Sequence, residues 1–402
     1  MKKERIKVIG LGQNFHDILP LYWKIIENAE ILVGGKRQLE FVSHLKAEKI
    51  PITSPIEEVL DKLRQRLGEN IVVLSDGDPL IFGIGKTLIK EFGADLVEIY
   101  PNVSTVQMAG AKIGLGVTDI HIVSLHGRDN FYKLLNAVTW HDVVGVYTDN
   151  VYNPQSIAKE LLDIGVNEFK MYVFENLGQK NEKIGEYSLS DAAKSEFSPL
   201  NFVILKRGTK REIEPYVGMD DDLFFKENNQ ITKKEIRVIS IGNLELKEDS
   251  FLVEIGAGSG SVSIEAATIA KKGRIIAIEK MKNRAELIEK NKKRFGIYSV
   301  EVINDRAEDV ISSYSYLDRV FIGGGLCKDP DLFFLCYDKL RQGGKIVANI
   351  VVLKTLINLM TLCKKKGIFF EITQVMVNRG SQIGEDLRLS PINPVFILSI
   401  KK

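Results

Sequence analysis

A glycine-rich turn that follows a hydrophobic run is the strongest candidate binding element in this sequence. Residues 253–267 read VEIGAGSGSVSIEAA, which predicts a strand ending at Ile255 and a helix beginning near Ser261. Glycines in such a turn let the backbone approach a ligand, and the helix N-terminus offers free N–H groups. A dinucleotide fingerprint would need a third glycine where Ser261 stands, and a P-loop would need a lysine in the loop. The turn therefore predicts a ligand site of another kind.

An acidic residue closes the next expected strand. Glu279 ends the run IIAIE, 23 residues after Gly256. An acid at that strand end can accept hydrogen bonds from both hydroxyls of a ribose. Enzymes that bind NAD also carry such an acid, and a solvated carboxylate that caps a helix is the plainer alternative. The neighbouring glycine loop favours the ligand role, because functional carboxylates gather at such sheet edges.

The first half of the chain carries a different set of loops. The GLG of residues 10–12 follows an expected strand, a weak signal that also fits a plain strand-to-helix turn. LSDGDPLIFGIG, residues 74–85, is more specific, because Asp78 precedes Pro79 and is pushed to extended geometry. The loop therefore exposes backbone groups at the end of a strand. PNVSTVQMAGAKIG (101–114), LHGR (125–128) and FENLG (174–178) follow, and Ser104 and Thr105 are expected to open a helix.

The cysteines and histidines do not form a metal-site pattern. The chain has three cysteines and no C-x-x-C pair, which predicts a reducing compartment and no structural zinc. Cys327 follows the glycine-rich run FIGGG with no activating base nearby, so we expect a buried thiol. The other two cysteines are Cys336 and Cys363. His121, His126 and His141 lack the spacing of metal ligands, which favours core or surface roles over catalysis.

Short β-rich runs alternate with amphipathic stretches in both halves, which predicts an α/β fold with largely parallel sheets. The last two strand candidates, 371–377 and 395–400, have no helix between them and predict an antiparallel pair at the sheet edge. Residues 209–230 are rich in charge and poor in periodic apolar positions, so we expect a linker there. The expected domains are residues 1–208 and 231–402.

Composition narrows the class of protein. The 402 residues predict two or three domains, and a net charge of +2 does not suggest a nucleic-acid partner. No apolar run approaches the roughly 18 residues of a membrane-spanning helix. The start, Met-Lys-Lys-Glu-Arg, leads into a strand-like run without the apolar region of a signal peptide. We expect a soluble cytoplasmic protein with no membrane partner.

The first-half motifs, taken in order, resemble the tetrapyrrole methylases, the class III S-adenosylmethionine (SAM) methyltransferases of corrin and siroheme synthesis. The set is GLG, GDP-x-x-x-G-x-G, P-x-x-S-T-x-Q and LHGR. The second half resembles the class I partner of that pathway in its glycine loop, NNQITKKEIR, FIGGG, GGKIVANIV and NPVFIL. The resemblance implies a class III tetrapyrrole-methylase α/β domain followed by a class I Rossmann-like SAM methyltransferase domain with an antiparallel edge hairpin.

The resemblance also implies two SAM sites. In the first domain SAM would contact Gly10, Leu11, Gly12, Gly77, Asp78, Pro79, Phe82, Gly83, Ser104 and Thr105. In the second it would contact Thr232, Gly256, Ala257, Gly258, Ser259, Gly260, Glu279 and Ala307. Thr232 would otherwise be interpreted as a simple helix N-cap. The first glycine loop departs from the family pattern G-x-G-P-G, because Gln13 and Asn14 stand in place of Pro-Gly.

The implied activity is methylation of carbons 5 and 15 of a precorrin or cobalt-precorrin, with decarboxylation of the ring C acetate, in a homo-oligomer. The substrate carries many carboxylates, so basic residues are expected near each site. Arg128 and Arg379 are the candidates, although a solvated surface arginine is the plainer interpretation of either. Asn349 lies where class I enzymes line their acceptor pocket.

Three alternatives stay open. A class I SAM enzyme acting on RNA or protein could carry a degenerate N-terminal docking domain, since class I domains share the glycine loop across many substrates. The N-terminal motif set and the absence of an N/D-P-P-Y/F sequence disfavour this alternative. An NAD-dependent oxidoreductase is disfavoured because both loops lack the third glycine. A scaffold with one inactive methylase half is kept open by Gln13 and Asn14.

Overall fold

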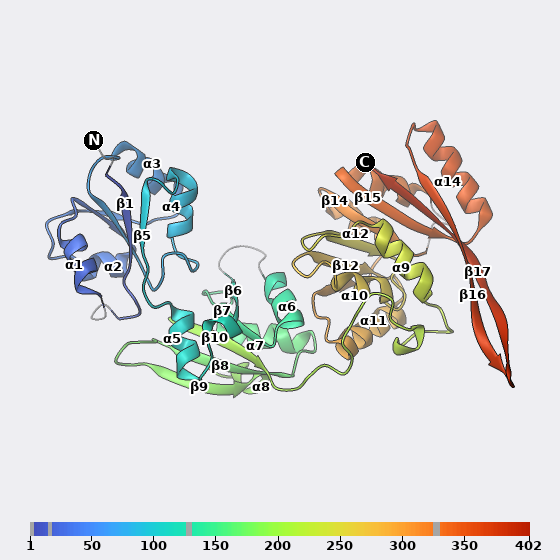
Figure 1. Cartoon of the computed structure of the whole chain (residues 1–402), viewed down its shortest axis with the longest axis horizontal. Helices are drawn as coiled ribbons and strands as arrows, with labels where there is room; N and C mark the ends of the chain where they lie inside the picture. Colours follow the sequence, from blue (N-terminus) through green and yellow to red (C-terminus); the bar gives the residue numbers. More distant parts are fainter. Residues whose placement is uncertain (1–3, 15–17, 126–130, 325–329) are drawn as a thin grey trace. The chain divides into compact units, whose positions relative to one another are not determined.

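The computed structural model describes residues 4–14, 18–125, 131–324 and 330–402, which form two compact units (Figure 1). The first unit comprises residues 1–130, 142–163 and 169–208. The second comprises residues 131–141, 164–168 and 209–402. Helix α6 (Phe131–Trp140) therefore belongs to the second unit, although its neighbours in sequence belong to the first.

The first unit begins with a five-stranded parallel sheet in the order β3-β2-β4-β1-β5. Its strands are β1 (Ile6–Gly10), β2 (Ile31–Gly34), β3 (Glu48–Pro51), β4 (Ile71–Ser75) and β5 (Val97–Tyr100). Its helices are α1 (Pro20–Glu27), α2 (Lys36–Phe41), α3 (Glu57–Gln65) and α4 (Gly85–Phe92). One face packs on α3 and α4 through residues such as Leu63 and Leu88, and the other packs on α1 and α2.

A second five-stranded sheet, β6-β7-β10-β8-β9, completes this unit. Its strands are β6 (His121–Ser124), β7 (Val143–Tyr147), β8 (Phe169–Glu175), β9 (Lys183–Ser188) and β10 (Asn201–Arg207). Its other elements are α5 (Thr105–Lys112), the 3₁₀ turn η2 (Val117–Asp119), α7 (Pro154–Asp163) and α8 (Leu189–Ala192). Only β6 and β7 pair in parallel, so this sheet is mixed rather than largely parallel as the sequence predicted.

The second unit is built on a seven-stranded sheet in the order β13-β12-β11-β14-β15-β17-β16. Its strands are β11 (Phe251–Ile255), β12 (Arg274–Ile278), β13 (Val300–Ile303), β14 (Leu317–Ile322), β15 (Leu340–Ile350), β16 (Glu371–Ile383) and β17 (Asp386–Lys401). Besides α6, its helical elements are η3 (Asp221–Leu223), α9 (Lys234–Asn243), α10 (Ser261–Ala267), α11 (Lys282–Phe295), α12 (Ala307–Ser313), α13 (Asp331–Lys339) and α14 (Leu353–Lys365).

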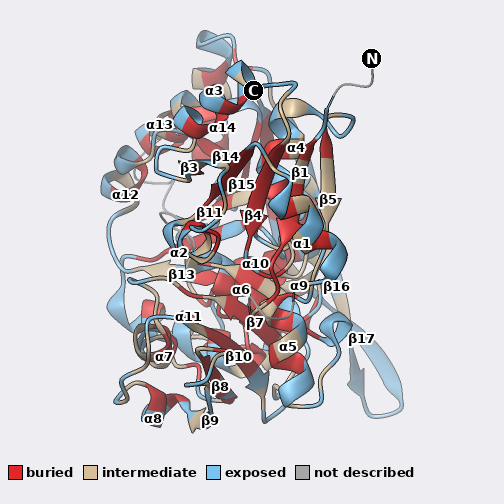
Figure 2. Cartoon of the chain, turned by 90° about the vertical axis from the view of Figure 1, so that its left-hand side faces the viewer, coloured by how far each residue is buried: buried red, intermediate tan, exposed pale blue. Residues whose placement is uncertain are grey.

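Helices cover both faces of this sheet. Val253 and Ile255 pack with α12, α13 and α14, whereas Leu252, which points to the opposite face, packs with α9, α10 and α11. The central strands β11, β12 and β14 are accordingly buried, while the outer helix faces and the β16–β17 hairpin are exposed (Figure 2). The α/β class is thus confirmed, and so is the antiparallel edge, because β17 pairs antiparallel with both β15 and β16.

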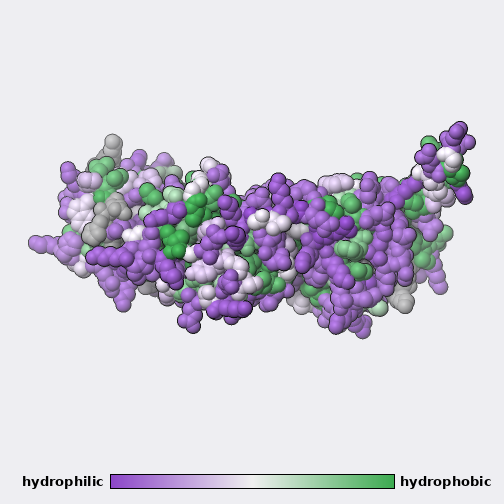
Figure 3. Space-filling model, turned by 90° about the horizontal axis from the view of Figure 1, so that it is seen from below, coloured by the Kyte–Doolittle hydropathy of each residue, from purple (hydrophilic) through white to green (hydrophobic). Residues whose placement is uncertain are grey.

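The β16–β17 hairpin extends beyond the sheet edge. Its pairing continues from Arg379 with Ser390 to Ile383 with Asp386, next to the turn. Apolar side chains here are exposed, among them Met376 and Leu387. The projecting ribbon, at the upper right in Figure 3, shows these apolar positions mixed with hydrophilic ones. Among the described residues, no helix combines the length and apolar character needed to cross a membrane.

The segment expected to be a linker, residues 209–230, packs within the second unit. Met219 and Phe224 are buried against the face covered by α9, α10 and α11. Asp221 is also buried, because it accepts hydrogen bonds from groups of α9 and β16. High charge in this segment therefore reflects paired carboxylates rather than solvation alone.

Candidate cofactor-binding sites

The first unit contains a cavity of about 680 Å³ between the loops of its two sheets. Five of the ten cofactor residues expected here line it, namely Gly77, Asp78, Phe82, Gly83 and Thr105. The other five do not line it and are Gly10, Leu11, Gly12, Pro79 and Ser104. The loop after β4 thus meets the start of α5 at the cavity, and their contact with a cofactor, which the resemblance implies, stays a prediction.

The turn at residues 10–12, which does not line the cavity, packs against the loops that form the cavity wall. Leu11 is fully buried, and its N–H donates to the Ser75 carbonyl oxygen at 2.9 Å. The Gly77 N–H donates to the Gly12 carbonyl oxygen at 3.0 Å. A Cβ on Gly10 would lie only 2.3 Å from the Gly77 carbonyl oxygen, so only glycine fits there. The GLG turn therefore supports the GDP loop from behind.

The GDP loop is strained where it meets the cavity. Phe82 has a φ of 53°, a left-handed conformation that bulky residues rarely adopt, and the residue is 55% exposed. The Leu80 N–H donates to Asp78 Oδ1 at 2.8 Å, which fixes the turn. Such strain concentrates at functional sites, where the surrounding structure maintains it. The expected contact of Phe82 with the cofactor stays a prediction.

Sequence reasoning missed several cavity residues. Tyr147, at the end of β7, lies between Phe82 and Phe202 with ring centroids 5.3 and 4.9 Å away. Burial raises the pKa of the Tyr147 phenol. The Thr105 hydroxyl and the Val106 N–H lower this pKa, but by less than burial raises it. Gln13, Arg37, Thr148, Asp149 and Asn201 also line the cavity. Tyr147 could have been predicted as a site residue, because it ends a strand and ligands of α/β proteins bind at the carboxyl ends of strands.

The helix expected after the first cavity loop is confirmed. Ser104 caps α5, since its hydroxyl accepts from the Gln107 N–H at 3.2 Å, and the Gln107 side chain accepts from the Ser104 N–H at 2.9 Å. This capping box fixes the entry of α5. It leaves Thr105, the first residue of the helix, at the cavity wall.

The second unit presents the other expected loop at the carboxyl end of β11. Gly256, Gly258 and Gly260 have φ values of 69°, 58° and 74°, all in the left-handed region that glycine tolerates. The N–H groups of Gly256 and Ala257 donate to the Ile278 carbonyl oxygen at 3.0 and 3.1 Å. Gly260 then caps α10, and Ser259 is buried beneath the turn.

Glu279 faces this loop, as its spacing predicted. Its side chain is buried, with Oε2 accepting from the Gly258 N–H at 2.9 Å and Oε1 from the Met281 N–H at 3.0 Å. The carboxylate therefore joins the glycine turn to the start of α11. Ala307 opens α12, beyond the next strand, and Asn304 Nδ2 donates to the Glu279 carbonyl oxygen at 2.8 Å.

A second carboxylate lies beneath the loop and was not singled out as a site residue. Glu254 Oε2 accepts from the Ser263 N–H at 2.8 Å and from the Ser263 hydroxyl. Burial raises its pKa to about 7, and the nearby charge of Glu279 adds to the rise, while Arg237 opposes it. Glu254 thus joins β11 to α10 on either side of the glycine turn.

The raised pKa of Glu254 predicts a pH-dependent stability. Between about pH 4.5 and 7 the folded chain holds a proton that the unfolded chain releases, so the free energy of unfolding falls as pH rises through this window. Glu254→Gln should remove this contribution, up to about 1.4 kcal/mol per pH unit. Denaturant unfolding of both proteins across the window measures it. An unchanged slope in the variant would contradict the prediction.

The three catalytic candidates have different outcomes. Arg128, like His126 and Cys327, lies outside the described residues. The Asn349 amide is held by the Ser240 hydroxyl at 3.0 Å, and its Nδ2 is buried without a partner among the described residues. Arg379 makes hydrogen-bonded ion pairs with Glu235 at 2.7 Å and Asp221 at 3.0 Å. Its guanidinium therefore ties the hairpin to α9.

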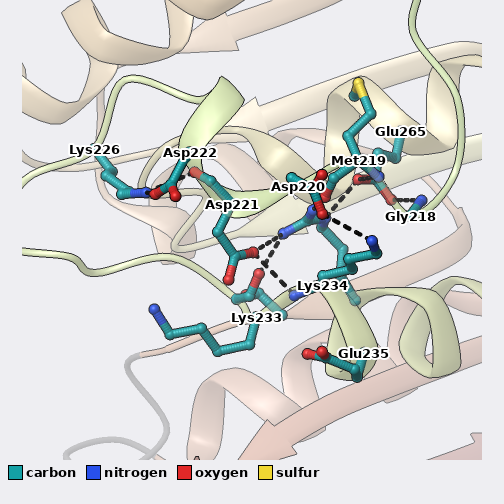
Figure 4. A network of polar contacts seen from close by, with 12 residues as sticks. Gly218, Met219, Asp220, Asp221, Asp222, Lys226, Lys233, Lys234, Glu235 and Glu265 are labelled. Atoms are coloured by element: carbon teal, nitrogen blue, oxygen red, sulfur yellow. Dashed lines mark hydrogen bonds and ion pairs between the residues drawn. The ribbon is translucent and has the colours of Figure 1, made fainter. Parts of the chain in front are cut away.

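A buried arginine organises the polar groups behind the second loop. Arg237 is fully buried and donates to Glu265 Oε1 at 2.7 Å and to Asp221 Oδ1 at 3.2 Å. It also donates to the carbonyl oxygens of Thr232 and Met219. Figure 4 shows Asp221 and Glu265 turned toward the centre of this network.

This network changes the interpretation of Thr232. The N-cap of α9 is Lys233 rather than Thr232, and no side chain caps it. Thr232 is instead held through its backbone by Arg237. Its expected contact with cofactor stays a prediction.

Comparison with known proteins defines the class of this chain. Residues 7–193 match the family model of the tetrapyrrole (corrin/porphyrin) methylases, and residues 223–402 match that of the precorrin methyltransferase domain. The chain is thus a methyltransferase in which these two domain types are joined.

Full-length relatives identify the particular family. A precorrin-6Y C(5,15)-methyltransferase (decarboxylating) from Sinorhizobium sp is 28% identical over 97% of this chain and 94% of its own length. Its namesake from Mycobacterium tuberculosis (strain CDC 1551 / Oshkosh) is 30% identical over 87% of this chain and 88% of its own. The chain belongs to the family of precorrin-6Y C(5,15)-methyltransferases (decarboxylating). A probable cobalt-precorrin-7 C(5)-methyltransferase from Methanocaldococcus jannaschii is 36% identical over 50% of this chain and 96% of its own.

Proposed function

We propose that this chain is a bifunctional SAM-dependent methyltransferase of cobalamin biosynthesis. It methylates carbons 5 and 15 of a precorrin or cobalt-precorrin and removes CO₂ from the acetate on ring C. The observation that carries the proposal is that each unit has its own ligand-type loop at the carboxyl ends of parallel strands. Family resemblance extends the proposal to a cytoplasmic homo-oligomer without nucleic-acid or membrane partners.

We assign carbon 5 to residues 1–208 and carbon 15 with decarboxylation to residues 231–402, joined by residues 209–230. The M. jannaschii relative supports this division, because it is named for C(5) methylation alone and aligns with only half of this chain. The two family models, each matching a different half, support it as well.

The residues of the second loop fit a SAM nucleoside. Each Glu279 oxygen accepts one backbone N–H, and a carboxylate oxygen has two lone pairs, so both oxygens keep capacity for the ribose hydroxyls. A Cβ on Gly258 meets no atom of the described residues within 4 Å, so none of them fills the space beside this glycine. These features support cofactor binding by Gly256–Gly260 and Glu279.

The first cavity fits the same cofactor by size and lining. Its volume of about 680 Å³ lies within the range of roughly 300–1,000 Å³ typical of small-molecule sites. Phe82 and Tyr147 offer aromatic surface, and Thr105 offers a hydroxyl. We propose that SAM binds there against the GDP loop.

When bound, SAM supplies a methyl group activated by its sulfonium for in-line displacement. Each site must hold the electron-rich carbon of the substrate at attack distance, which matters more than a strong base. In decarboxylation the bond between the acetate methylene and its carboxylate breaks, the electron pair enters the conjugated ring system, and a proton is taken up. The protein must orient the acetate and manage that proton.

Calorimetric titration with S-adenosylhomocysteine tests the proposal. We expect two sites per chain, and one in Gly258→Arg, which is directed at the second loop. With precorrin substrate, mass spectrometry should show the gain of two methyl groups and the loss of one CO₂. A single site abolished by Gly258→Arg would mean that the first unit does not hold cofactor. Absence of any binding would refute the methyltransferase mechanism.

A further inference from the structure

Gln13, one of the two residues that depart from the family loop, takes part in the first site. Its Nε2 donates to Thr105 Oγ1 at 2.9 Å, across 92 positions of sequence. Both side chains line the cavity. The residue that replaces the family's proline thus ties the turn after β1 to the first residue of α5.

Close packing fixes the Gln13 side chain on two more sides. A Cβ on Gly77 would lie 3.1 Å from Gln13 Nε2, so the amide rests against the GDP loop. A Cβ on Gly178, in the loop after β8, would lie 2.9 Å from the Gln13 Cβ. Both glycines have positive φ values, which suit glycine in such close approaches. Gln13 therefore joins three loops of the cavity.

The direction of the hydrogen bond matters for Tyr147. Because the Gln13 amide occupies a lone pair of the Thr105 oxygen, the Thr105 proton is available to another acceptor. Burial raises the pKa of the Tyr147 phenol, and the Thr105 hydroxyl and the Val106 N–H lower it in part. Tyr147 lines the same cavity as Gln13 and Thr105, so the orientation of the Thr105 hydroxyl bears on the cavity wall.

We propose that Gln13 is a positioning residue of the first SAM site, acting through Thr105. Its amide orients the Thr105 hydroxyl, and through it Tyr147, and so replaces the rigidity of a proline by a hydrogen-bonded crosslink. The inference rests on the proposed function, since it takes the first cavity to hold SAM.

The test uses the full chain carrying Gly258→Arg, so that only the first site is titrated with S-adenosylhomocysteine. Gln13→Met keeps the length of the side chain but removes the donor, and should weaken binding by about 5-fold, the usual effect of one hydrogen bond. Gln13→Glu should weaken S-adenosylhomocysteine binding too, because its carboxylate can only accept from Thr105 and would turn the Thr105 hydroxyl proton toward itself. Gln155→Met, on α7 and outside the cavity lining, makes the same chemical change and should have no effect.

A double-mutant cycle separates positioning from space filling. Thr105→Val should weaken binding by a similar factor, and Gln13→Met combined with it should weaken binding no further. Unchanged affinity in Gln13→Met and Gln13→Glu, or independent effects in the double variant, would overturn the role of Gln13 and leave the proposed function standing. Absence of any binding in the Gly258→Arg background would instead refute cofactor binding by the first unit, and this inference with it.

Discussion

Arg237→Met is expected to lower the free energy of unfolding of the second unit by about 3–5 kcal/mol. Arg237 is fully buried, and its guanidinium is the cation between Glu265 and Asp221. Without it, Glu265 and Asp221, which have little access to water, each lose a cationic partner, although Asp221 keeps its ion pair with Arg379. The carbonyl oxygens of Thr232 and Met219 also lose a donor. Burying an unpaired charge is among the largest single costs that a substitution can impose.

The loss should grow with pH. Burial already raises the pKa of Glu265, although Arg237 and the N–H groups of Gly218 and Met219 lower it. Removing Arg237 raises this pKa further, so the folded variant binds a proton more strongly than the unfolded chain does. Its stability then falls as pH rises through the raised pKa. Denaturant unfolding, followed by hydrogen exchange in α9 and α10, measures the loss at several pH values.

Arg379→Met is the matched control, because Arg379 pairs with the same Asp221 from the hairpin. Its side chain is 41% exposed, so water can solvate the partners that it leaves. We expect a loss of about 1 kcal/mol or less. If both variants lost the same free energy of unfolding, burial would not be the reason why Arg237 contributes to stability.

Neither the burial of Arg237 nor the ion pairs of Arg379 could be predicted from the sequence. Arg237 stands in a helix, and arginine in a helix predicts a solvated side chain. Its burial arises only because the acidic segment GMDDD folds over α9, a contact that spacing does not reveal. Arg379 was a candidate for substrate carboxylates, yet its guanidinium pairs with Glu235 and Asp221 within the fold.

The two candidate sites differ in how far the sequence predicted them. The second loop and Glu279 lie on adjacent strands of a parallel sheet, so their spacing along the chain was enough to place them together. The first cavity draws on both sheets of its unit, and Tyr147 reaches it from the end of β7 whereas Gln13 reaches it from the turn after β1. Topology, not spacing, brings such residues together.

Antiparallel pairing in the first unit was missed for a related reason. β9, KIGEYS, is exposed along most of its length and lacks the apolar run expected of a strand. It forms because β8 offers an open edge, to which Lys183–Ser188 pairs residue by residue. In the second unit the absence of a helix between the last two strands was a local signal, and the hairpin could be predicted.

Gly258→Arg is expected to weaken S-adenosylhomocysteine binding at the second loop on the order of 100-fold or more, roughly 2.7 kcal/mol. A Cβ at Gly258 meets no atom of the described residues within 4 Å, so the new side chain starts in open space beside the turn. There it fills the volume proposed for the cofactor and brings a positive charge beside the carboxylate of Glu279. Both effects oppose a ligand that needs the same space and the same carboxylate.

Gly367→Arg controls for backbone strain. Gly367 also has a positive φ, 68°, and a Cβ there also meets no atom within 4 Å in the part of the chain that the structure describes, but it follows α14 rather than β11. Each substitution should cost about 1–2 kcal/mol of stability, the usual penalty of a side chain in left-handed geometry. Only the change at Gly258 should reduce the number of sites that calorimetry counts. Two sites retained in Gly258→Arg would show that cofactor binds elsewhere in the second unit, and a site lost in Gly367→Arg would show that strain alone suffices.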